Sequence, residues 1–544
     1  MNNLLRHQHL LLATAEQSRE TDRLTISSLG IPGDTLMETA GRGAARLITN
    51  DLPPQSSILF ICGKGNNAGD ALVAARILLN EGYQIGIYPI MGIEKFSTDA
   101  ARNLKRLEMV SGKSLMEVTF WDEWPKIENY DLLVDAIFGT GLQRTVKTPV
   151  DDIIHRINRT PLPVWALDIP SGLHSDTGEV QGVAVHAEKT IQFGLRKLGC
   201  YLGSGPVYAG IREYVPLSFP EIFKRDIGIR LLDESIDPVK TLVLEREPDQ
   251  INHDSQHSHA SSQQINLTSQ NRNGHHEDIK NVPLHKYNNG VVHVIGGSAG
   301  LTGAPLYTAH AAWSLGMGAV SLIHPAAWAQ TMDHLAPQLI KIPIGNSGDK
   351  HFSKKDVNRV LNYLADRPGV TVIGPGIGRH ENTRAFIRSI IKDSDGPLII
   401  DADGLRALTV GDKLLSKRKQ SDNVILTPHP GELAYLSGKP IHNDSQRLKY
   451  TRDLSSAMRC TVLAKGSPVF VHLSNPSQTL VTGYDNSVFS RAGFGDILAG
   501  HIAAFFSRTN DVVQSCENGL LHGYKKIIEI RNQGRLFPEP SDLL

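Results

Sequence analysis

The first half of the 544-residue chain contains a glycine- and asparagine-rich turn whose residue types suit the binding of a phosphate group. This turn, Gly63–Asp70, follows the apolar run Ile58–Cys62 and precedes a run of helix formers. Glycines at a strand-to-helix turn let backbone N–H groups approach a phosphate, and the helix N-terminus favours its negative charge. A glycine-rich turn can be a tight turn and nothing more. Two consecutive asparagines and an aspartate are harder to explain in that way.

Two later apolar runs of the first half end in a carboxylate followed by a polar turn. Asp135 precedes the loop Gly139–Gly141, and Asp168 precedes Ser171. A single aspartate after a strand could simply cap the next helix. Together with Asn67, however, Asp135 and Ser171 offer hard oxygen ligands, which suit an alkali or alkaline-earth cation better than zinc.

The second half contains a series of glycine- or proline-rich turns, each placed after an apolar run. The turns are Gly296–Gly303, Gly374–Gly378, Asp401–Gly404, Thr427–Glu432, Lys465–Ser467 and Ala492–Asp496. The last, Gly-x-Gly-Asp at a helix start, can present N–H groups to a transferring phosphoryl group. Asp496 then lies where it could accept a proton from a substrate hydroxyl, although alone it could equally be a helix cap. His429, between two prolines and beside Glu432, is a candidate substrate contact, although a lone loop histidine is more often structural.

Short apolar runs alternate with helical stretches throughout the chain, which predicts an α/β protein with mostly parallel sheets covered on both faces. Ligands in such folds bind at the carboxyl ends of strands, where the turns above lie. The predicted strands are Ile58–Cys62, Ile85–Ile90, Leu132–Asp135, Val164–Asp168, Thr190–Phe193, Val291–Ile295, Val320–Ile323, Val370–Ile373, Leu398–Asp401, Val424–Leu426 and Val462–Ala464.

Helix signals open the chain. Thr14 can cap a helix, Gln17 completes a capping box, and Gly30 with Pro32 ends the helix. A second helix is predicted to begin near Asp34.

Composition narrows the class of protein. Lysine and arginine (56) balance aspartate and glutamate (56), which argues against a nucleic-acid binder that relies on overall charge. There is no apolar run of about 18 residues, so no membrane span is predicted. Arg6, His7 and His9 interrupt the leucines near the N-terminus, so no signal peptide is predicted either. The cysteines form no Cys-x-x-Cys pair, and we expect reduced thiols in a cytoplasmic protein. They are Cys62, Cys200, Cys460 and Cys516.

The first-half motifs resemble the NAD(P)H-hydrate epimerases, across roughly Thr14 to Tyr208. The resemblance implies a Rossmann-like fold that binds hydrated NADH or NADPH. It implies a potassium ion (K⁺) held by Asn67, Asp135 and Ser171, with Asp168 as the acid or base that inverts the hydrated C6 centre. The substrate contacts that it implies are Asn66, Asn67, Ala68, Gly69, Asp70, Gly139, Thr140, Gly141, Leu142, Gln143, Arg144, Thr145 and Asp168.

The second-half motifs resemble the ADP/ATP-dependent NAD(P)H-hydrate dehydratases, from about His285 to Leu521. The resemblance implies a ribokinase-like fold and Mg²⁺-dependent phosphoryl transfer to the hydrate, with Asp496 as the base. Fusion of both activities resembles bacterial and archaeal proteins, which favours ADP as the donor. The implied hydrate contacts are Ala304, Gly376, His429 and Asp496, and the implied nucleotide contacts are Lys465, Gly466, Ser467, Pro468, Val469 and Gly495.

A polar tract, Asp249–Asn281, separates the two sets of motifs. Its histidines could bind metal, but the lack of apolar periodicity favours a disordered linker. The prediction is an epimerase domain at 1–240, a His/Gln/Asn/Ser-rich linker at 241–282 and a dehydratase domain at 283–535.

The chain departs from both families at a few positions. Ala68 stands where the epimerases usually have glycine, and it would strain a position that needs a positive φ. In the second half, Phe494 replaces a threonine, Ser490–Arg491 replaces Ala-Thr, Arg406 replaces an asparagine and Tyr287–Asn288 replaces Gly-Asp. We expect the fold and the nucleotide site to persist, with turnover of the second half reduced or absent.

Two other functions remain open at this stage. Ribokinase-like folds also serve small-alcohol and vitamin-precursor kinases. The first half of the chain argues against this function, because such kinases have no use for a second nucleotide site. The chain could also be a nucleotide sensor with a degenerate second domain. In each case the expected partners are small molecules, such as hydrated NADH or NADPH and ADP, without nucleic acid or membrane. Homo-oligomerisation stays open.

Overall fold

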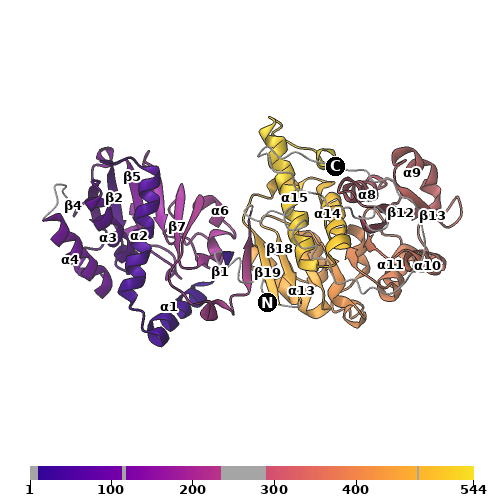
Figure 1. Ribbon diagram of the computed structural model, residues 1–544, viewed down its shortest axis with the longest axis horizontal. Coiled ribbons are helices and arrows are strands. Elements are labelled where there is room, and N and C mark those ends of the chain that lie inside the picture. The colour runs from indigo at the N-terminus through magenta and orange to yellow at the C-terminus, as the bar shows by residue number, and fades with distance from the viewer. Residues whose placement is uncertain (1–9, 113–117, 234–288, 475–476) are drawn as a thin grey trace, which may run out of the picture. The chain divides into compact units, whose positions relative to one another are not determined.

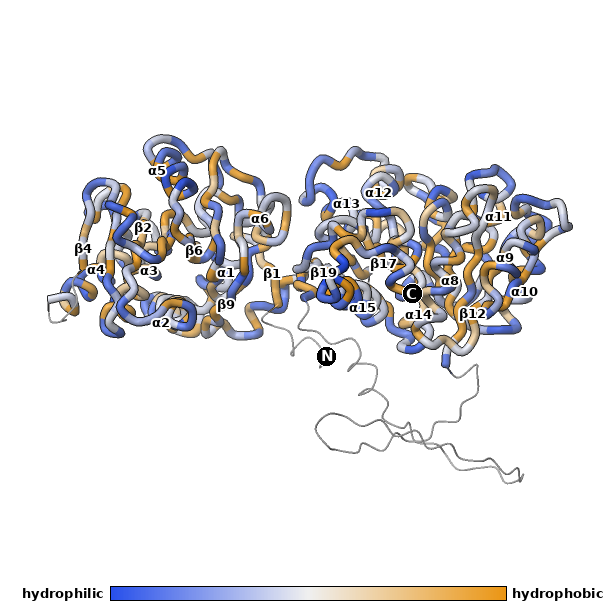
Figure 2. Tube along the Cα trace, turned by 90° about the horizontal axis from the view of Figure 1, so that it is seen from above, coloured by the Kyte–Doolittle hydropathy of each residue, from blue (hydrophilic) through white to orange (hydrophobic). Residues whose placement is uncertain are grey.

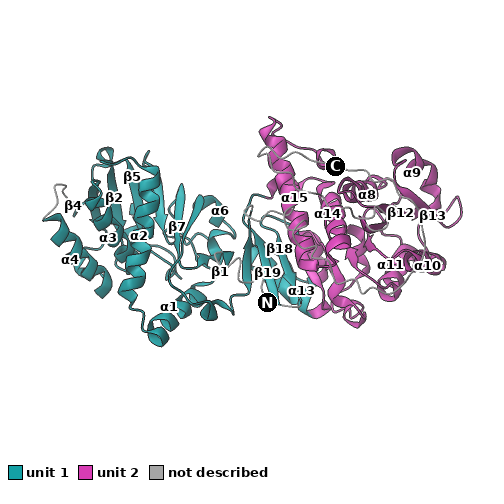
Figure 3. Cartoon of the chain, viewed as in Figure 1, with its two compact units in different colours: residues 1–233, 437–456, 464–485 teal, residues 234–436, 457–463, 486–544 magenta. Residues whose placement is uncertain are grey.

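The computed structural model describes residues 10–112, 118–233, 289–474 and 477–544 (Figure 1). By their internal contacts they form two compact units (Figure 3). Unit 1 comprises Met1–Asp233, Ser437–Ser456 and Ala464–Asp485, and unit 2 comprises Glu234–Leu436, Ala457–Leu463 and Asn486–Leu544. The predicted linker at 241–282 and the departure at Tyr287–Asn288 lie outside the described residues.

Two helices open unit 1 as predicted. Helix α1 (Ala15–Leu29) begins with a complete capping box, in which the Gln17 N–H donates to Thr14 Oγ1 at 3.2 Å and the Thr14 N–H donates to Gln17 Oε1 at 3.0 Å. Gly30 ends the helix with a φ of 67°, a conformation that glycine adopts without a Cβ penalty. Helix α2 (Gly33–Asp51) begins one residue before Asp34.

Unit 1 is built around a seven-stranded sheet with the order β4-β3-β2-β5-β6-β7-β9, in which every pair is parallel. These strands are β2 (Ser57–Cys62), β3 (Gln84–Pro89), β4 (Val118–Phe120), β5 (Leu132–Ala136), β6 (Val164–Leu167), β7 (Lys189–Phe193) and β9 (Ile211–Val215). Strand β1 (Leu12–Ala13), just before α1 in the chain, pairs in parallel with β8 (Arg196–Lys197) to form a separate two-stranded sheet.

Helices cover both faces of this sheet. Side chains alternate along each strand, so one strand contributes side chains to a core on each face. Ile58 and Phe60 of β2 pack in one core with α2, α3 (Asn66–Asn80) and α4 (Thr98–Ser111). Leu59 and Ile61 pack in a second core with α5 (Val150–Ile157). The three-layer arrangement and its parallel strands confirm the predicted α/β class for this part of the chain.

A second set of strands in unit 1 joins segments far apart in the sequence. Strand β10 (Ile229–Leu232) pairs in parallel with β19 (Gln478–Thr482), and β19 pairs antiparallel with β18 (Phe470–Leu473). None of these three strands was predicted from the sequence. Their pairing explains why residues 464–485 group with the first half. Helices α6 (Gly205–Tyr208) and most of α13 (Asp444–Met458) also belong to unit 1.

Unit 2 contains parallel strands in the order β17-β16-β15-β14-β11-β12-β13. The strands are β11 (Val291–Ile295), β12 (Ala319–Pro325), β13 (Ile340–Ile344), β14 (Val370–Ile373), β15 (Leu398–Ile400), β16 (Val424–Leu426) and β17 (Thr461–Ala464). The helices are α8 (Gly303–Ser314), α9 (Ala329–Leu335), α10 (Val357–Asp366), α11 (Glu381–Asp393), α12 (Pro430–Ser437), α14 (Phe494–Thr509) and α15 (Val512–Asn532).

Every apolar run predicted as a strand overlaps one of these strands, and Figure 2 shows apolar residues gathered along them. The four cysteines are buried free thiols. Among the described residues, no helix has the length and apolar character needed to cross a membrane.

Candidate functional site

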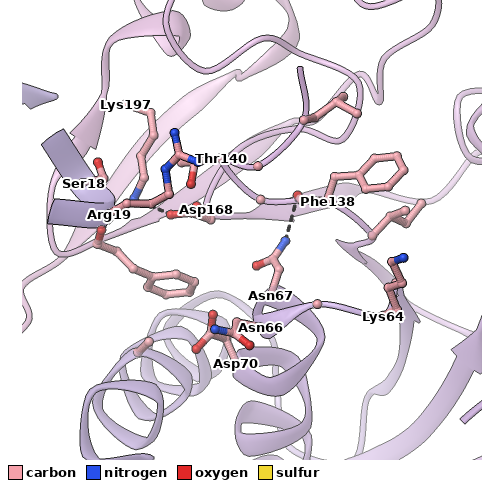
Figure 4. Close-up of a pocket in the computed structure, with 18 of the residues that line it drawn as sticks. Ser18, Arg19, Lys64, Asn66, Asn67, Asp70, Phe138, Thr140, Asp168 and Lys197 are labelled. Atoms are coloured by element: carbon pink, nitrogen blue, oxygen red, sulfur yellow. Dashed lines mark hydrogen bonds and ion pairs between the residues drawn. The ribbon is translucent and has the colours of Figure 1, made fainter. Parts of the chain in front are cut away.

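A cavity of about 1280 Å³ opens in unit 1 at the carboxyl ends of β2 and β5 (Figure 4). Strand order reverses between these two strands, since β3 lies on one side of β2 and β5 on the other. Crevices at such reversal points are the usual ligand sites of open α/β sheets. The turn after β2, the loop after β5 and one face of α1 all line this cavity.

Most of the predicted substrate contacts of the first half lie on this cavity. Asn66, Asn67, Asp70, Asp168 and the whole loop Gly139–Thr145 line it. Ala68 and Gly69 do not, because they face the packed side of α3.

Ala68 is fully buried and Gly69 lies against Met37 of α2, where an added Cβ would come within 2.6 Å of the Met37 side chain. Ala68 is not among the residues with a positive φ, so alanine causes no backbone strain there.

The three predicted cation ligands form one buried network. Ser171 Oγ donates to Asp135 Oδ1 at 2.7 Å, and the Ser171 N–H donates to Asp135 Oδ2 at 2.8 Å. Asn67 Nδ2 donates to the Phe138 and Leu167 carbonyls at 3.0 and 3.1 Å. Ser171 Oγ also accepts from the Phe138 N–H at 2.8 Å. Asn67 and Ser171 therefore both bond to the backbone of Phe138, and Asp135 joins the network through Ser171.

Two features of this network suit a cation. The two carbonyls fix the orientation of the Asn67 amide, so its buried Oδ1 is left without a hydrogen-bond partner. Burial also raises the pKa of Asp135 to about 6, although the hydrogen bonds from Ser171 lower it. A cation would satisfy the amide oxygen and favour the charged carboxylate. Among the described residues there is no group of three His, Cys, Asp or Glu side chains that could hold a metal ion.

Asp168, the predicted acid or base, forms an ion pair with Lys197 at the cavity wall (Figure 4). Asp168 has a φ of 67°, which is uncommon for a residue with a side chain and recurs at functional sites. An added Cβ on Gly139 would lie 3.3 Å from Asp168 Oδ2, so the bare glycine keeps the space beside the carboxylate open. Lys197 also donates to the Phe193 carbonyl at 2.7 Å.

Lys197 and the face of α1 were missed by the sequence analysis. Lys197 lies on β8, a two-residue strand with no periodic signal, and its pairing with β1 brings α1 close. Ser18, Arg19 and Asp22 of α1 line the cavity. The four-residue spacing of Ser18 and Asp22, which places both on one helix face, is the signal that could have identified them.

Lys197 acts on three carboxyls: it pairs with Asp168 and opposes the pKa shifts of Asp22 and Asp70. Burial raises the pKa of Asp22 to about 6; Lys197 opposes the shift and Asp168 adds to it. Burial also raises the pKa of Asp70 well above its usual value, again with Asp168 adding and Lys197 opposing. The wall of the cavity thus combines two carboxyls of raised pKa with the Asp168–Lys197 ion pair.

In unit 2, predicted residues gather at the ends of β11 and β14 and at the start of α14. The Gly376 carbonyl accepts from Ser298 Oγ at 2.8 Å, and Gly376 packs against Pro305 of α8, next to Ala304. Gly493 has a φ of 94° and begins α14 beside Tyr307 of the same helix α8. Gly495 and Asp496 follow in the first turn of α14.

His429 lies at the end of β16, with a separate set of polar groups. Its Nδ1 accepts from the Gly431 N–H at 3.0 Å, and its Nε2 lies 3.3 Å from Glu432 Oε1. Arg379 donates to Asp403 Oδ1 at 2.8 Å after the neighbouring strands. The ring is thus oriented by its own turn, and about half of the side chain stays exposed.

The predicted nucleotide residues Lys465–Val469 form a loop of unit 1 that leads into β18. The Val469 N–H donates to Thr482 Oγ1 at 2.8 Å, and the Lys465 and Pro468 carbonyls accept from Arg447 of α13 at 3.0 and 2.7 Å. Arg447 was not predicted from the sequence, because its importance comes only from these contacts with the loop.

Three residues that depart from the family pattern of the second half, Phe494, Arg491 and Arg406, make contacts within the protein. Phe494 is buried in an apolar cluster with Ala311, Ile497 and Leu543, and its ring meets Phe489 edge-on at 5.7 Å. Arg491 donates to the Pro538 carbonyl. Arg406 lies over the Tyr435 ring at 4.8 Å.

Two protein-family models match the chain. One, described as the YjeF-related protein N-terminus, matches residues 33–199, and the other, described as NAD(P)H-hydrate dehydratase, matches residues 292–527. The bifunctional NAD(P)H-hydrate repair enzyme Nnr of Salinibacter ruber is 30% identical over 91% of this chain and 87% of its own length. The enzyme of the same name from Coxiella burnetii is 30% identical over 93% and 91%, respectively.

Solved structures with similar regions include two of interest. An ADP/ATP-dependent NAD(P)H-hydrate dehydratase from Bacillus subtilis, co-crystallised with ATP/Mg²⁺, is 18% identical with a TM-score of 0.41, over 51% of this chain and 91% of its own. The yeast protein ynu0 is 23% identical with a TM-score of 0.34, over 39% and 93%.

Replacing Phe494 with threonine, Phe494→Thr, should destabilise unit 2, although threonine is the usual residue in the dehydratases that this half resembles. The change leaves a cavity in the cluster and buries a hydroxyl, so we expect the free energy of unfolding to fall by about 3–5 kcal/mol. Urea unfolding measures this. The same substitution at the exposed Phe537 is the control and should change stability by about 0.5 kcal/mol or less. Equal effects at the two positions would contradict the structure.

The raised pKa of Asp22 predicts a pH-dependent stability. The folded carboxyl binds its proton more tightly than the unfolded one, so the folded state holds more protons between about pH 4 and about pH 6. The free energy of unfolding therefore falls as the pH rises through this window.

Asp22→Asn should remove part of that fall. At pH 7 the variant should be more stable than the wild type by on the order of 1 kcal/mol after allowance for solvent screening, and near pH 4 the two should agree. Chemical unfolding at both pH values measures the difference. Asp453→Asn, at an exposed carboxyl of α13, should show no such difference; a less stable Asp22→Asn variant at pH 7 would refute the prediction.

Proposed function

The chain belongs to the family of bifunctional NAD(P)H-hydrate repair enzymes, and from that premise we propose that it interconverts the R- and S-hydrates of NADH and NADPH and dehydrates the S-hydrate with ADP. The products of the second reaction are NAD(P)H, AMP and phosphate. The observation that carries the proposal is the cavity of unit 1, where the turn after β2, the loop Gly139–Thr145 and the Asp168–Lys197 pair meet.

Domain assignment follows the two matched regions. We assign epimerisation to residues 1–240, a linker to 241–282 and dehydration to 283–535, which contain the matched stretches 33–199 and 292–527. The contacts of β10 with β19 add a structural connection between residues of the first and third of these ranges.

Epimerisation requires the C6 hydroxyl of the hydrate to leave from one face and return on the other. Protonation of that hydroxyl lets it depart as water, while the ring nitrogen donates its lone pair to C6. Water then adds to the opposite face and gives up a proton. Asp168 is our candidate for this proton transfer, because its carboxylate faces the open space beside Gly139.

The neighbouring groups support that role. Lys197 holds the Asp168 carboxylate in place from the cavity wall. Burial raises the pKa of the Asp22 and Asp70 carboxyls, so these groups bind a proton more readily than exposed carboxyls do. Asn66, Asp70 and the loop Gly139–Thr145 bind the rest of the dinucleotide, with the N-terminus of α3 suited to a phosphate.

Asn67, Asp135 and Ser171 fit a potassium ion, on the evidence of the Asn67 amide oxygen without a partner and the buried Asp135 carboxylate. Such an ion would supply a fixed positive charge beneath the loop that begins at Phe138. Within the protein itself, these residues hold the loop after β5 against the turn after β2.

Dehydration is assigned to the second half. Asp496 accepts the proton of the hydrate hydroxyl, whose oxygen bonds to the β-phosphorus of ADP while the bond from that phosphorus to the bridging oxygen of AMP breaks. Loss of phosphate from C6 and of a proton from C5 then restores the nicotinamide double bond. Mg²⁺ would neutralise phosphate charge, Lys465–Val469 and Gly495 bind the nucleotide, and Ala304, Gly376 and His429 contact the hydrate. Helix α14 favours negative charge at its start, where Asp496 lies.

The decisive assay uses mixed R- and S-hydrates of NADH and follows recovery of NADH absorbance with ADP, with ATP and with no nucleotide. The proposal predicts complete recovery with ADP and none without nucleotide. Half recovery would mean that only the second half is active, and no recovery with either nucleotide would refute dehydration. A stable phosphorylated product would indicate a kinase.

Two variants separate the activities. Asp496→Asn should slow dehydration by about 100-fold or more while epimerisation, followed by chromatography of the hydrates, persists. Asp168→Asn should leave rapid recovery of only the S-hydrate half of the mixture. Loss of both activities in either variant would contradict this division of labour.

Epimerisation should depend on K⁺ through Asn67. Replacement of K⁺ by choline is expected to slow epimerisation, and Asn67→Leu should raise the half-saturating K⁺ concentration by about tenfold or more, since a buried ligand oxygen is lost. Asn103→Leu is the matched control, because Asn103 is also buried but bonds to the Asp99 carbonyl within α4. An unchanged K⁺ response in Asn67→Leu would remove Asn67 from the ion site.

A further inference from the structure

A buried arginine outside every sequence motif supports the predicted nucleotide loop. Arg447 of α13 is 4% exposed. Its guanidinium donates to the Lys465 carbonyl at 3.0 Å and to the Pro468 carbonyl at 2.7 Å, at the two ends of the loop. It also lies over the Phe470 ring at 4.3 Å, where the loop enters β18. One side chain thus fixes both ends of Lys465–Pro468.

The loop is shaped to admit this guanidinium. Gly466 has a φ of 145°, and an added Cβ there would lie 2.1 Å from Arg447 Nη1. A side chain at this position would press on the guanidinium and would also strain the backbone. Gly466 in this turn therefore suits the guanidinium and the positive φ, independently of any ligand.

The acidic partner of Arg447 reaches a turn of the first half. Asp444 Oδ1 accepts from Arg447 at 2.8 Å, and Asp444 Oδ2 accepts from the Gly203 N–H at 2.9 Å. The preceding residue, Asn443, donates to Glu179 Oε1 at 3.0 Å. All of these residues belong to unit 1, and they form a continuous chain of contacts from Gly203 to the nucleotide loop.

We propose that Asp444 and Arg447 are positioning residues for nucleotide binding, through which a turn of the first half holds the loop Lys465–Val469 in its binding conformation. This rests on the proposed function in one respect, namely that the loop binds ADP. Neither side chain acts in the chemical step. Their effect is to fix in advance the backbone groups that receive the nucleotide, which lowers the ordering cost of binding.

A purely structural role would give a different result. If the Asp444–Arg447 pair only fastened two segments together, its loss would lower stability without a specific change in affinity for ADP. A positioning role instead weakens ADP binding in protein that is still folded. Hydrogen bonds from a charged donor are worth about ten- to hundredfold in an equilibrium constant, which sets the size of the expected effect.

The experiment measures ADP binding to the full chain by calorimetry and, separately, KM for ADP and kcat of dehydration. Arg447→Lys keeps the charge but cannot bond to both carbonyls at once, so we expect its Kd and KM for ADP to rise about tenfold or more. The kcat at saturating ADP should stay within about threefold of the wild type. Epimerisation, which uses another site, reports on folding of the variant.

Asp444 supplies a second, milder variant. Asp444→Asn retains an oxygen for the Gly203 N–H but removes the charge that orients Arg447, so ADP affinity should fall in the same direction, by about three- to tenfold. Asp444→Glu should recover part of this loss.

The matched control is Arg418→Lys in unit 2. Arg418 is likewise buried and donates to the Ile391 carbonyl at 2.7 Å and the Gly396 carbonyl at 2.6 Å, with no contact to the loop. Its substitution should leave the Kd for ADP unchanged.

An unchanged Kd for ADP in folded Arg447→Lys, or an equal loss in Arg418→Lys, would overturn the inference. Failure of the proposed function is a separate result, since wild-type protein that binds ADP but gives no NADH would refute dehydration and leave the comparison of ADP affinities intact. Wild-type protein that does not bind ADP would refute both.

Discussion

The ion pair between Asp168 and Lys197 is the interaction on which the first site depends. Burial makes each nearby carboxyl costly to ionise, as the raised pKa values of Asp22 and Asp70 show. The positive charge of Lys197 lowers the pKa of both carboxyls and so opposes the effect of burial. It is held there by the Phe193 carbonyl and by the pairing of β8 with β1. A two-residue strand therefore places the lysine that opposes the pKa shifts of both carboxyls.

Much of the fold could be predicted because buried parallel strands have a strong local signature. Runs such as Val291–Ile295 are mostly apolar and are buried on both faces, and because the strands are parallel the polar turns that follow them lie at one edge of a sheet. That edge brings Asn67, Asp135 and Ser171 together, although they are about 100 residues apart in the chain at most. The short strands β10, β18 and β19 were not predicted. The pairing of β10 with β19 joins residues far apart in the sequence, which no local pattern indicates.

Lys197, Asp22 and Arg447 could not be found in the same way. Each is a charged residue in a segment without a motif, and its importance comes from what lies opposite it in space. For Arg447, the only trace in the sequence is Gly466. This glycine was interpreted as part of a nucleotide-binding turn, but its lack of a side chain also leaves room for the guanidinium. A motif in a sequence can thus record the needs of the supporting residues as well as those of the ligand.

The unusual turn before α14 illustrates the complementary point. A Gly-x-Gly-Asp turn acts through backbone N–H groups and the final carboxylate, so the side chain at its second position is free to serve another purpose. Phe494 uses that freedom to join the cluster around Leu543 and Phe489, and Arg491 bonds to the backbone at Pro538. Because these contacts draw on residues 538–543, the departures from the family pattern at 491 and 494 belong together with that later segment. A substitution that looks like decay in the motif is, in the structure, a different way of anchoring the same backbone.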